Sequence, residues 1–299
     1  MPRSGPALLL AYLLAFASPL AAQNLDSVQI TRQRVADGVY MLLGAGGNIG
    51  VSVGADGVFV IDDQYAPLSE KIKATVRTLS TLPIRFVINT HWHGDHTGGN
   101  ENLAHDGTLI IAHENVRKRM SVEQFNAVFN TRTPPKPVAA LPVVTFTDGV
   151  TFYLNSDTIQ VLHVKAAHTD GDAIIYFRKA NVIHAGDTFF NGFYPFIDAS
   201  TGGSLDGMIA AADQILSLAN DQTRIIPGHG PLGGRTEVKA FRDMLATVRV
   251  RLARAKIQGM TAEQVMNANL LADLDSTWGK GFLTPAQFVA IAYGSLGKP

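Results

Sequence analysis

Four side chains of metal-binding type stand within six positions of the sequence, in the run His91-Trp92-His93-Gly94-Asp95-His96. His91 and His93 alternate, so an extended backbone points both to the same side. Asp95 and His96 flank a turn after glycine and can reach a second position about 3.5–4 Å from the first, the separation typical of paired metal ions. Only 9 histidines occur in 299 residues, so this density predicts a metal site rather than chance histidines in a polar loop.

The donor types in this run narrow the choice of metal. The sequence has 0 cysteines, which excludes thiolate ligands, a cysteine nucleophile and disulfides. Imidazole and carboxylate donors suit Zn²⁺, with Mn²⁺ or Fe as competitors. Without a metal, partly buried imidazoles and a carboxylate would lack partners at a cost in free energy. We therefore expect Zn²⁺ as the cofactor.

The histidine run must be held by regular structure, and the first half of the chain is rich in strand signals. Asp37-Gly38 and Asp56-Gly57 are hairpin turn signals. A helix is expected over residues 69–82, because Ile72, Val76 and Leu79 recur at helical spacing. The last predicted strand ends directly before the run. Strands are expected at residues 39–43, 50–53, 58–61 and 84–88.

The second half repeats this order of strands followed by helices. Helices are expected over residues 205–218 and along an apolar stripe at 238–252. The last helix is expected to begin at Thr284, which opens a capping box with proline at the first helical position. Strands are expected at residues 143–146, 151–154, 159–164, 173–177, 181–185 and 224–226.

Each half of the chain has several strands followed by helices. This order predicts an α/β fold in which two sheets pack face to face with helices outside, a four-layer αββα sandwich. No linker divides residues 23–299, so one domain is expected. The 46% apolar and 17% charged content excludes a disordered chain. The balance of 25 basic and 25 acidic side chains argues against nucleic acid as a partner.

Residues 1–22 have the pattern of a secretory signal peptide. Arg3 precedes an apolar run at 7–17, and small residues at 18–22 suit cleavage. The run is short for a membrane span of about 20 residues, although a retained anchor is the alternative. No other segment is apolar enough to span a bilayer. We expect a periplasmic or secreted protein.

The histidine run resembles the His-x-His-x-Asp-His motif of the metallo-β-lactamase superfamily, and the resemblance covers nearly the whole mature chain. The later segments match in order: Ala167-His168-Thr169-Asp170-Gly171-Asp172, Ala185-Gly186-Asp187-Thr188 and Pro227-Gly228-His229-Gly230. Asp62, which closes the strand at 58–61, is similar to an early aspartate of the family. The family implies the αββα sandwich and a metal-dependent hydrolase.

The resemblance also implies a role for each matched residue. Two zinc ions per chain are expected, with Asp187 between them. A shared metal-bound hydroxide would attack an acyl carbon, and Asp95 would be the catalytic residue that accepts and passes on a proton. Asp62 and Asp172 would orient imidazoles. The first zinc would be held by His91, His93 and His168, and the second by Asp95, His96 and His229.

Departures from the family patterns bear on the substrate, which we expect to be a small molecule, either a lactam or a lactone. Flavo-di-iron relatives carry glutamate where this chain has His93, which favours hydrolysis over redox chemistry. The cysteine-containing β-lactamases have a thiolate at Asp187 and a lysine three residues later, where this chain has Phe190. The segment at 186–190 looks closer to glyoxalase II, although residues 191–196 lack its arginine-rich glutathione site.

Two other functions remain as alternatives: a thioester hydrolase of glyoxalase II type, and a periplasmic metal-binding accessory protein of a dehydrogenase system. Asn191 and Tyr194 are the polar candidates for substrate contact within an aromatic segment that suggests an apolar mouth. The other histidines are expected to have ordinary roles, with His105 and His113 at the surface and His163 and His184 within strands. The sequence leaves the oligomeric state open.

Overall fold

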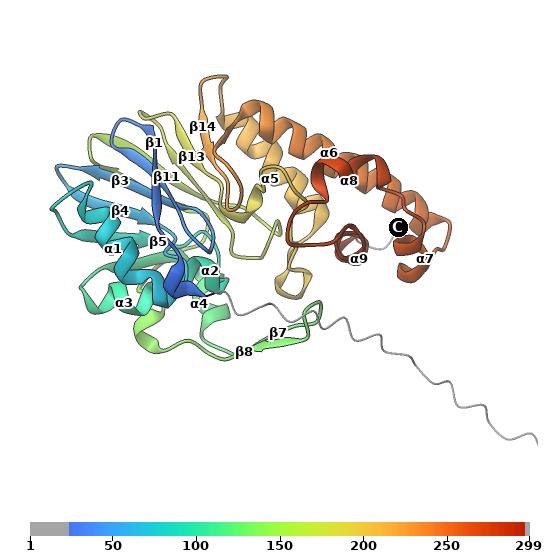
Figure 1. Cartoon of the computed structure of the whole chain (residues 1–299), viewed down its shortest axis with the longest axis horizontal. Helices are drawn as coiled ribbons and strands as arrows, with labels where there is room; N and C mark the ends of the chain where they lie inside the picture. Colours follow the sequence, from blue (N-terminus) through green and yellow to red (C-terminus); the bar gives the residue numbers. More distant parts are fainter. Residues whose placement is uncertain (1–23, 297–299) are drawn as a thin grey trace, which may run out of the picture.

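A computed structural model describes residues 24–296, and in it two β-sheets pack face to face between layers of helices (Figure 1). The first sheet is antiparallel through its first four strands and parallel beyond them. Its spatial order is β1 (Thr31–Ala36), β2 (Val39–Leu43), β3 (Ile49–Gly54), β4 (Gly57–Ile61), β5 (Ile84–Ile88), β6 (Leu109–His113) and β9 (Val144–Phe146).

The second sheet begins with an antiparallel meander and contains one parallel pair, β13 with β14. A short two-stranded hairpin, β7 (Gln124–Asn126) and β8 (Thr131–Thr133), stands apart from both sheets. The second sheet has the order β10 (Gly149–Leu154), β11 (Asp157–His163), β12 (Ala173–Phe177), β13 (Val182–His184), β14 (Arg224–Ile226) and β15 (Gly233–Gly234).

Successive side chains of a strand point alternately into two apolar cores, one between the sheets and one under the outer helices. In β4, Phe59 and Ile61 face the second sheet, whereas Val58 and Val60 face the outer helices. This follows from the two-residue period of a strand. Every residue of β4 is buried because helices and the second sheet cover its two faces. The confirmed fold is therefore the expected αββα sandwich.

The outer helices carry the remaining apolar surface. On the first sheet, Ile72 and Val76 of α1 (Ser69–Arg77) pack into the outer core with Leu103 of α3 (Asn100–His105). On the second sheet the outer core is formed mainly by α5 (Leu205–Leu218), α6 (Arg235–Ile257) and α9 (Pro285–Ser295). The other helices are α2 (Gly94–Thr97), α4 (Glu114–Met120), α7 (Ala262–Asn267) and α8 (Ala272–Trp278).

Helix ends test the local predictions. Helix α9 begins after Thr284, whose hydroxyl accepts from the Gln287 N–H, so the predicted capping box is confirmed. Helix α1 is shorter than predicted, because it ends at Arg77 and the Thr78 N–H bonds back to Thr75 in a tightened last turn. Thr78 and Leu79 form a turn instead, and residues 80–82 are irregular.

The parallel strands explain how the histidine run is placed. Strands β4, β5 and β6 run parallel, with Ile61, Ile88 and Ile111 in register. Their carboxyl ends therefore meet at one edge of the sheet. The residues that follow β4 and β5, which include Asp62 and the histidine run, are side by side at this edge.

The predicted signal peptide lies outside the described residues, so export remains a prediction. Within residues 24–296, no helix is both long and apolar enough to cross a membrane.

Candidate metal centre

The seven expected ligands come from loops at one end of the two sheets. His91 and His93 follow β5, and Asp95 and His96 lie in α2. The second sheet contributes the rest. His168 lies between β11 and β12, Asp187 lies in a single helical turn at Gly186–Thr188 after β13, and His229 follows β14.

The structure brings all seven side chains together. One group of donors is His91, His93 and His168, and another is Asp95, His96 and His229, with the ligand atoms of each group within 4.8 Å of one another. We call them the three-histidine side and the aspartate side. A third overlapping group joins His91, His96 and Asp187.

Asp187 lies at the middle of the cluster. Its Oδ1 is 3.2 Å from Nε2 of His96, and its Oδ2 is 3.4 Å from Nε2 of His168 and 3.5 Å from Nε2 of His229. The same oxygen is 3.8 Å from Nε2 of His91. One carboxylate therefore contacts both sides, as a bridging ligand must.

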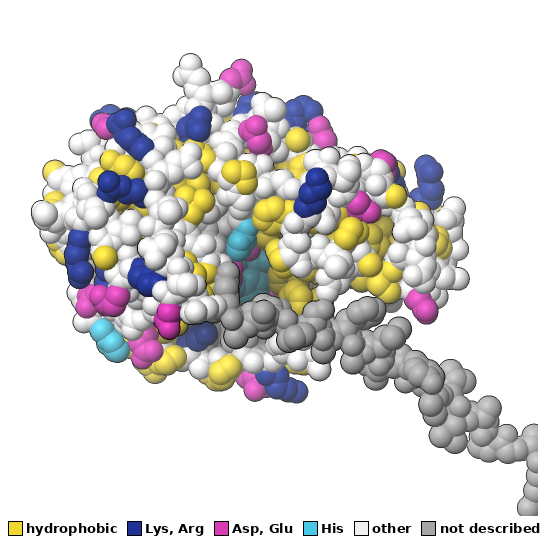
Figure 2. All heavy atoms as spheres, in the orientation of Figure 1, with side chains coloured by type: hydrophobic (Ala, Val, Ile, Leu, Met, Phe, Trp, Pro, Cys, Tyr) yellow, Lys and Arg dark blue, Asp and Glu magenta, His cyan; other side chains and the backbone are white. Residues whose placement is uncertain are grey.

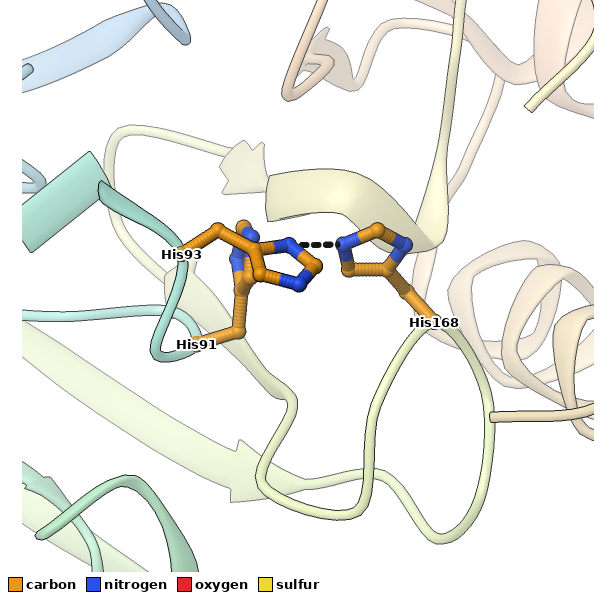
Figure 3. Close-up of side chains that lie close together, drawn as sticks. All are labelled: His91, His93 and His168. Atoms are coloured by element: carbon orange, nitrogen blue, oxygen red, sulfur yellow. Dashed lines mark hydrogen bonds between the residues drawn. The ribbon is translucent and has the colours of Figure 1, made fainter. Parts of the chain in front are cut away.

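The hydrogen bonds behind the three-histidine side show which ring nitrogens are free. Asp198 accepts from Nε2 of His93 at 3.0 Å, and the Phe196 carbonyl accepts from Nδ1 of His168 at 2.8 Å. This leaves lone pairs on Nδ1 of His93 and Nε2 of His168, which face each other at 2.8 Å (Figure 3). Two lone pairs that face each other at this distance repel, and a cation bound beside them would relieve the repulsion.

His91 completes this arrangement. The Thr90 hydroxyl donates to Asp62 at 2.8 Å, so its oxygen accepts from Nδ1 of His91 at 3.0 Å. Nε2 of His91 then points inward without a hydrogen-bond partner, and it is buried. Oδ1 of Asp187 is also buried and, although it lies 3.2 Å from Nε2 of His96, it accepts no well-aligned hydrogen bond. Buried polar atoms without partners are costly. These orphaned atoms beside the lone pairs fit a bound metal ion.

On the aspartate side, His96 is fixed in the same way. Asp62 accepts from Nδ1 of His96 at 2.8 Å and from the Thr90 N–H at 2.7 Å. Nε2 of His96 is thereby turned toward Asp187 and lies 3.6 Å from Asp95. Asp95 is also 3.3 Å from Nε2 of His229. Asp62 therefore positions an imidazole, as the sequence suggested.

Asp172 acts on the backbone rather than on a ring. Its carboxylate accepts from the backbone N–H groups of His168 and Thr169 at 2.6 and 2.8 Å, and from the Thr169 hydroxyl. Burial raises the pKa of Asp172 to about 8, despite these hydrogen bonds. Asp172 therefore holds the loop that presents His168.

The two sides of the centre differ in their electrostatics. Burial lowers the pKa of His168 to about 4 and lowers that of His91 well below its usual value. Burial acts in the same direction on His96 and His229, but Asp187 and Asp95 outweigh it. The pKa of His96 is therefore raised, and that of His229 is raised to about 9.

The carboxylates respond in the opposite direction. Burial raises the pKa of Asp95 and Asp187, but the surrounding histidines outweigh it and hold both values well below the usual range. Both groups are therefore ionised at neutral pH. Three acceptor nitrogens on one side and carboxylates on the other are a donor set that suits Zn²⁺.

Two glycines let the backbone approach this centre. A Cβ at Gly47 would lie 2.1 Å from Cε1 of His96, and one at Gly228 would lie 1.9 Å from Oδ1 of Asp187. Only glycine leaves room at these positions. Asn48 joins the two segments, because its side-chain amide donates to the carbonyls of Pro227 and Gly230 at 3.0 and 2.9 Å.

The two predicted substrate contacts have other partners. The Tyr194 hydroxyl donates to Asp275 at 2.9 Å, and the ring stacks on Phe288 at 4.2 Å. The Asn191 amide donates to the Pro231 carbonyl at 2.8 Å. The structure therefore does not bring either polar group into the ligand cluster, and both hold neighbouring segments in place.

The remaining histidines mostly follow expectation. His105 is exposed, and His163 and His184 lie within strands. The prediction for His113 was wrong, because this residue is buried at the end of β6. Its Nε2 donates to the Thr147 carbonyl at 2.8 Å, and its ring stacks on His163 at 3.7 Å.

Sequence reasoning missed Thr90, Asp198 and the Phe196 carbonyl, which fix three of the imidazoles. Thr90 adjoins the histidine run, so its position carried a usable signal. Asp198 is 105 positions from His93. A backbone carbonyl has no sequence signature at all.

With the fold and site described, the chain can be compared with known proteins. The profile of the metallo-beta-lactamase superfamily matches residues 46–232. The chain belongs to this superfamily. Its members are mainly hydrolases, and the clustered histidines and aspartates of this chain fit a metal site.

Two curated relatives match part of the chain. Hydroxyacylglutathione hydrolase of Nitrosococcus oceani is 31% identical over 146 residues, which is 48% of this chain and 47% of that protein. The alpha subunit of 2,4-dinitroanisole O-demethylase of a Nocardioides species is 27% identical over 164 residues, 53% of this chain and 44% of that protein. The chain thus spans about half the length of these curated relatives.

Solved structures share the fold at low sequence identity. A metallo-beta-lactamase from Pontibacter korlensis aligns with a TM-score of 0.58 at 18% identity, over 73% of this chain and 99% of that one. A variant of the sec-alkyl sulfatase PisA1 aligns with a TM-score of 0.66 at 17% identity, over 88% of this chain and 49% of that one.

Proposed function

We propose that this protein is an exported hydrolase that holds two zinc ions and opens a lactam or a lactone. The observation that most supports the proposal is the meeting of both donor groups at Asp187, beside the orphaned Nε2 of His91. The three-histidine side would hold one ion and the aspartate side the other. Bound zinc lowers the pKa of water and polarises an acyl oxygen.

The protein's own residues divide the remaining work. The Asp95 side chain is 24% exposed, whereas that of Asp187 is 6% exposed. Asp95 is therefore the carboxylate that solvent and substrate reach. Because its pKa is held well below the usual range, Asp95 is ionised and would accept a hydrogen bond from the attacking water, and a proton taken from that water would pass through Asp95 to the leaving group. Asp62, Asp198 and Thr90 keep the imidazoles oriented.

Purified protein tests the function directly. We expect zinc-loaded protein to hydrolyse nitrocefin or an acyl-homoserine lactone, chelation to remove the activity, and added zinc to restore it. Metal analysis should give two zinc ions per chain. If neither substrate is turned over by protein shown to hold metal, the lactam and lactone assignment is wrong.

A thioester hydrolase of glyoxalase II type is the second candidate. It is favoured by the relative from Nitrosococcus oceani, whose name describes hydrolysis of hydroxyacylglutathione. Turnover of S-lactoylglutathione in the same assay, without lactam or lactone activity, would select it. If metal-loaded protein hydrolyses none of the three substrates, the accessory-protein alternative is favoured.

Export is tested separately. We expect the protein expressed in a Gram-negative host to be recovered from the periplasm with a new N-terminus close to residue 23. Recovery of the intact chain from the membrane fraction would favour the retained anchor.

A further inference from the structure

A line of aromatic rings leads from the three-histidine side to solvent. The buried ring of Phe196 lies 5.9 Å from the ring of His93 and 5.7 Å from that of His168, between centroids. Phe129 continues the line at 5.2 Å from Phe196. Phe129 is 36% exposed and lies in the loop of the β7–β8 hairpin. We call Phe196 and Phe129 the hairpin ring line.

A second line leads away from the aspartate side. The buried ring of Phe190 stacks on His229 with a centroid distance of 5.4 Å and an angle of 17° between the planes. Phe282 lies 6.4 Å from Phe190 and is 58% exposed. The Phe193 ring forms a triangle with these two rings, at 5.8 Å from Phe190 and 6.5 Å from Phe282. We call Phe190 and Phe282 the loop ring line.

Both outer rings are held in position. The Asn126 side chain accepts from the N–H groups of Val128 and Phe129 at 3.0 and 3.2 Å, which sets the turn of the hairpin. Beside Phe282, a Cβ at Gly281 would lie 2.7 Å from the Phe193 ring, so this backbone packs directly on the aromatic wall. Leu283 is buried and anchors the other side of the loop.

The two lines start from different histidines of the metal centre, because Phe196 adjoins His93 and His168 whereas Phe190 stacks on His229 and lies 6.0 Å from His168. Figure 2 shows histidine side chains in a hollow at the middle of this face, with hydrophobic side chains beside it. The outer rings come from segments about 150 positions apart in the sequence, near residues 129 and 282. Large exposed rings that adjoin a polar site are typical of ligand pockets, in which apolar walls surround a few polar groups.

We propose that Phe129 and Phe282 determine substrate specificity by packing against an uncharged apolar substituent of the substrate at the mouth of the metal centre. This inference rests on the proposed function, because it takes the metal centre as the place of the reaction. The preferred substrate is then an acyl compound with a long alkyl or aromatic substituent. Phe190, three residues after Asp187, is a buried uncharged ring, so this position carries no cation that could bind a substrate carboxylate.

Matched substrates test this proposal. The ratio of kcat/KM for N-dodecanoyl-homoserine lactone to that for N-butyryl-homoserine lactone should favour the long chain in the zinc-loaded protein. We expect Phe129→Ala and Phe282→Ala each to lower this ratio by about tenfold, because each removes apolar contact area from the long chain alone.

Phe125→Ala is the matched control. Phe125 is 46% exposed and lies in the same hairpin, but its ring contacts Arg132 at 5.1 Å instead of the ring lines. This variant should keep the ratio within about twofold of the original protein. An equal loss in all three variants would show a general effect of the hairpin or surface and would overturn the proposal.

A binding measurement separates this proposal from the proposed reaction. Calorimetry with the ring-opened products, N-dodecanoyl-homoserine and N-butyryl-homoserine, needs no turnover. One outcome is that the protein hydrolyses neither lactone and still binds the long product more tightly than the short one. If Phe129→Ala and Phe282→Ala abolish this binding preference, the apolar site is supported and only the proposed reaction is wrong. Equal affinity for both products would overturn the apolar site.

Size-exclusion chromatography of the same variants tests whether the exposed rings form a contact between subunits instead. A change from dimer to monomer in Phe129→Ala or Phe282→Ala, without a change in the substrate ratio, would assign these rings to a subunit contact and overturn the proposal.

Discussion

The two sides of the metal centre are built from similar residues but are prepared for metal in different ways. On the three-histidine side, partners behind the rings leave lone pairs facing inward, and burial lowers the pKa of His91 and His168. On the aspartate side, His96 and His229 have raised pKa values because they face carboxylates. The first side is thus ready for a cation, whereas the second holds protons that a cation must displace.

The solvent exposure of the ligand side chains also differs between the two sides. The side chains of His91 and His168 are fully buried, whereas those of Asp95 and His229 are 24% and 23% exposed. We infer that the three-histidine side binds its metal more tightly and that the aspartate side exchanges with solvent more readily. The following predictions test this difference.

The largest effect is expected from Asp187→Ala, because Asp187 contacts both sides. Occupancy of both metals should fall, and turnover should drop by more than about a hundredfold, since even groups behind the ligands alter metal affinity or activity by 10–100-fold. Metal analysis after gel filtration measures occupancy. Asp37→Ala, at a fully exposed aspartate, is the control. Two tightly held zinc ions in the Asp187 variant would exclude the bridging role.

His93→Ala should affect one side first. We expect loss of the metal of the three-histidine side and of turnover, again by more than about a hundredfold, while circular dichroism shows an unchanged fold. The fold should persist because His93 lies in a loop above the sandwich. His105→Ala, at an exposed histidine, should behave like the original protein. Full turnover in His93→Ala would remove the metal assignment.

Asp198→Asn should have a smaller and more local effect. Oδ2 of Asp198 accepts from His93, while Oδ1 accepts from Ser200, and asparagine can keep the second contact. Loss of the carboxylate should lower metal affinity about 10–100-fold on the three-histidine side only. Competition titrations with a zinc chelator measure both affinities. An equal loss of zinc affinity on both sides would show that the Asp198 carboxylate does not act on the three-histidine side alone.

The smallest expected difference between the two sides is in the protons that zinc binding releases. Calorimetry of zinc binding in buffers of different ionisation enthalpy should show proton release at pH 7.5 from the aspartate side, where the pKa values of His96 and His229 are raised. Because the pKa of His229 is about 9, the release should fall as the pH rises through 9. Zinc affinity of the aspartate side should weaken as the pH falls. If the protons came from the three-histidine side instead, that side and not the aspartate side would be the protonated one, and the proposed difference would be wrong.

The sequence predicts the parts of this protein that depend on local pattern. Strand alternation, the capping box at Thr284 and the order of halves indicate the αββα fold, and the run from His91 to His96 indicates the metal site. Long-range partners were not accessible in this way. Asp198 reaches His93 only through tertiary folding, and nothing in the sequence indicates that the Tyr194 hydroxyl donates to Asp275, 81 positions away.

The hairpin shows the same limit. Residues 124–133 lack the alternation of a half-buried strand, because β7 and β8 pair only with each other and bury little. Likewise, His113 has the polarity of a surface residue, but the Thr147 carbonyl satisfies its ring inside the protein. Burial of a polar group depends on a partner that only the folded chain supplies.

The spacing of the ligands along the chain affects the order of assembly. Four ligands lie between residues 91 and 96 in the first half, and the other three lie at 168, 187 and 229 in the second. During synthesis the amino-terminal half therefore emerges with an incomplete set: the three-histidine side needs His168 as well, and the aspartate side is incomplete until His229 has joined the second sheet. Metal capture by this centre would accordingly be a late event in biogenesis, and a bound metal would link the two halves of the sandwich.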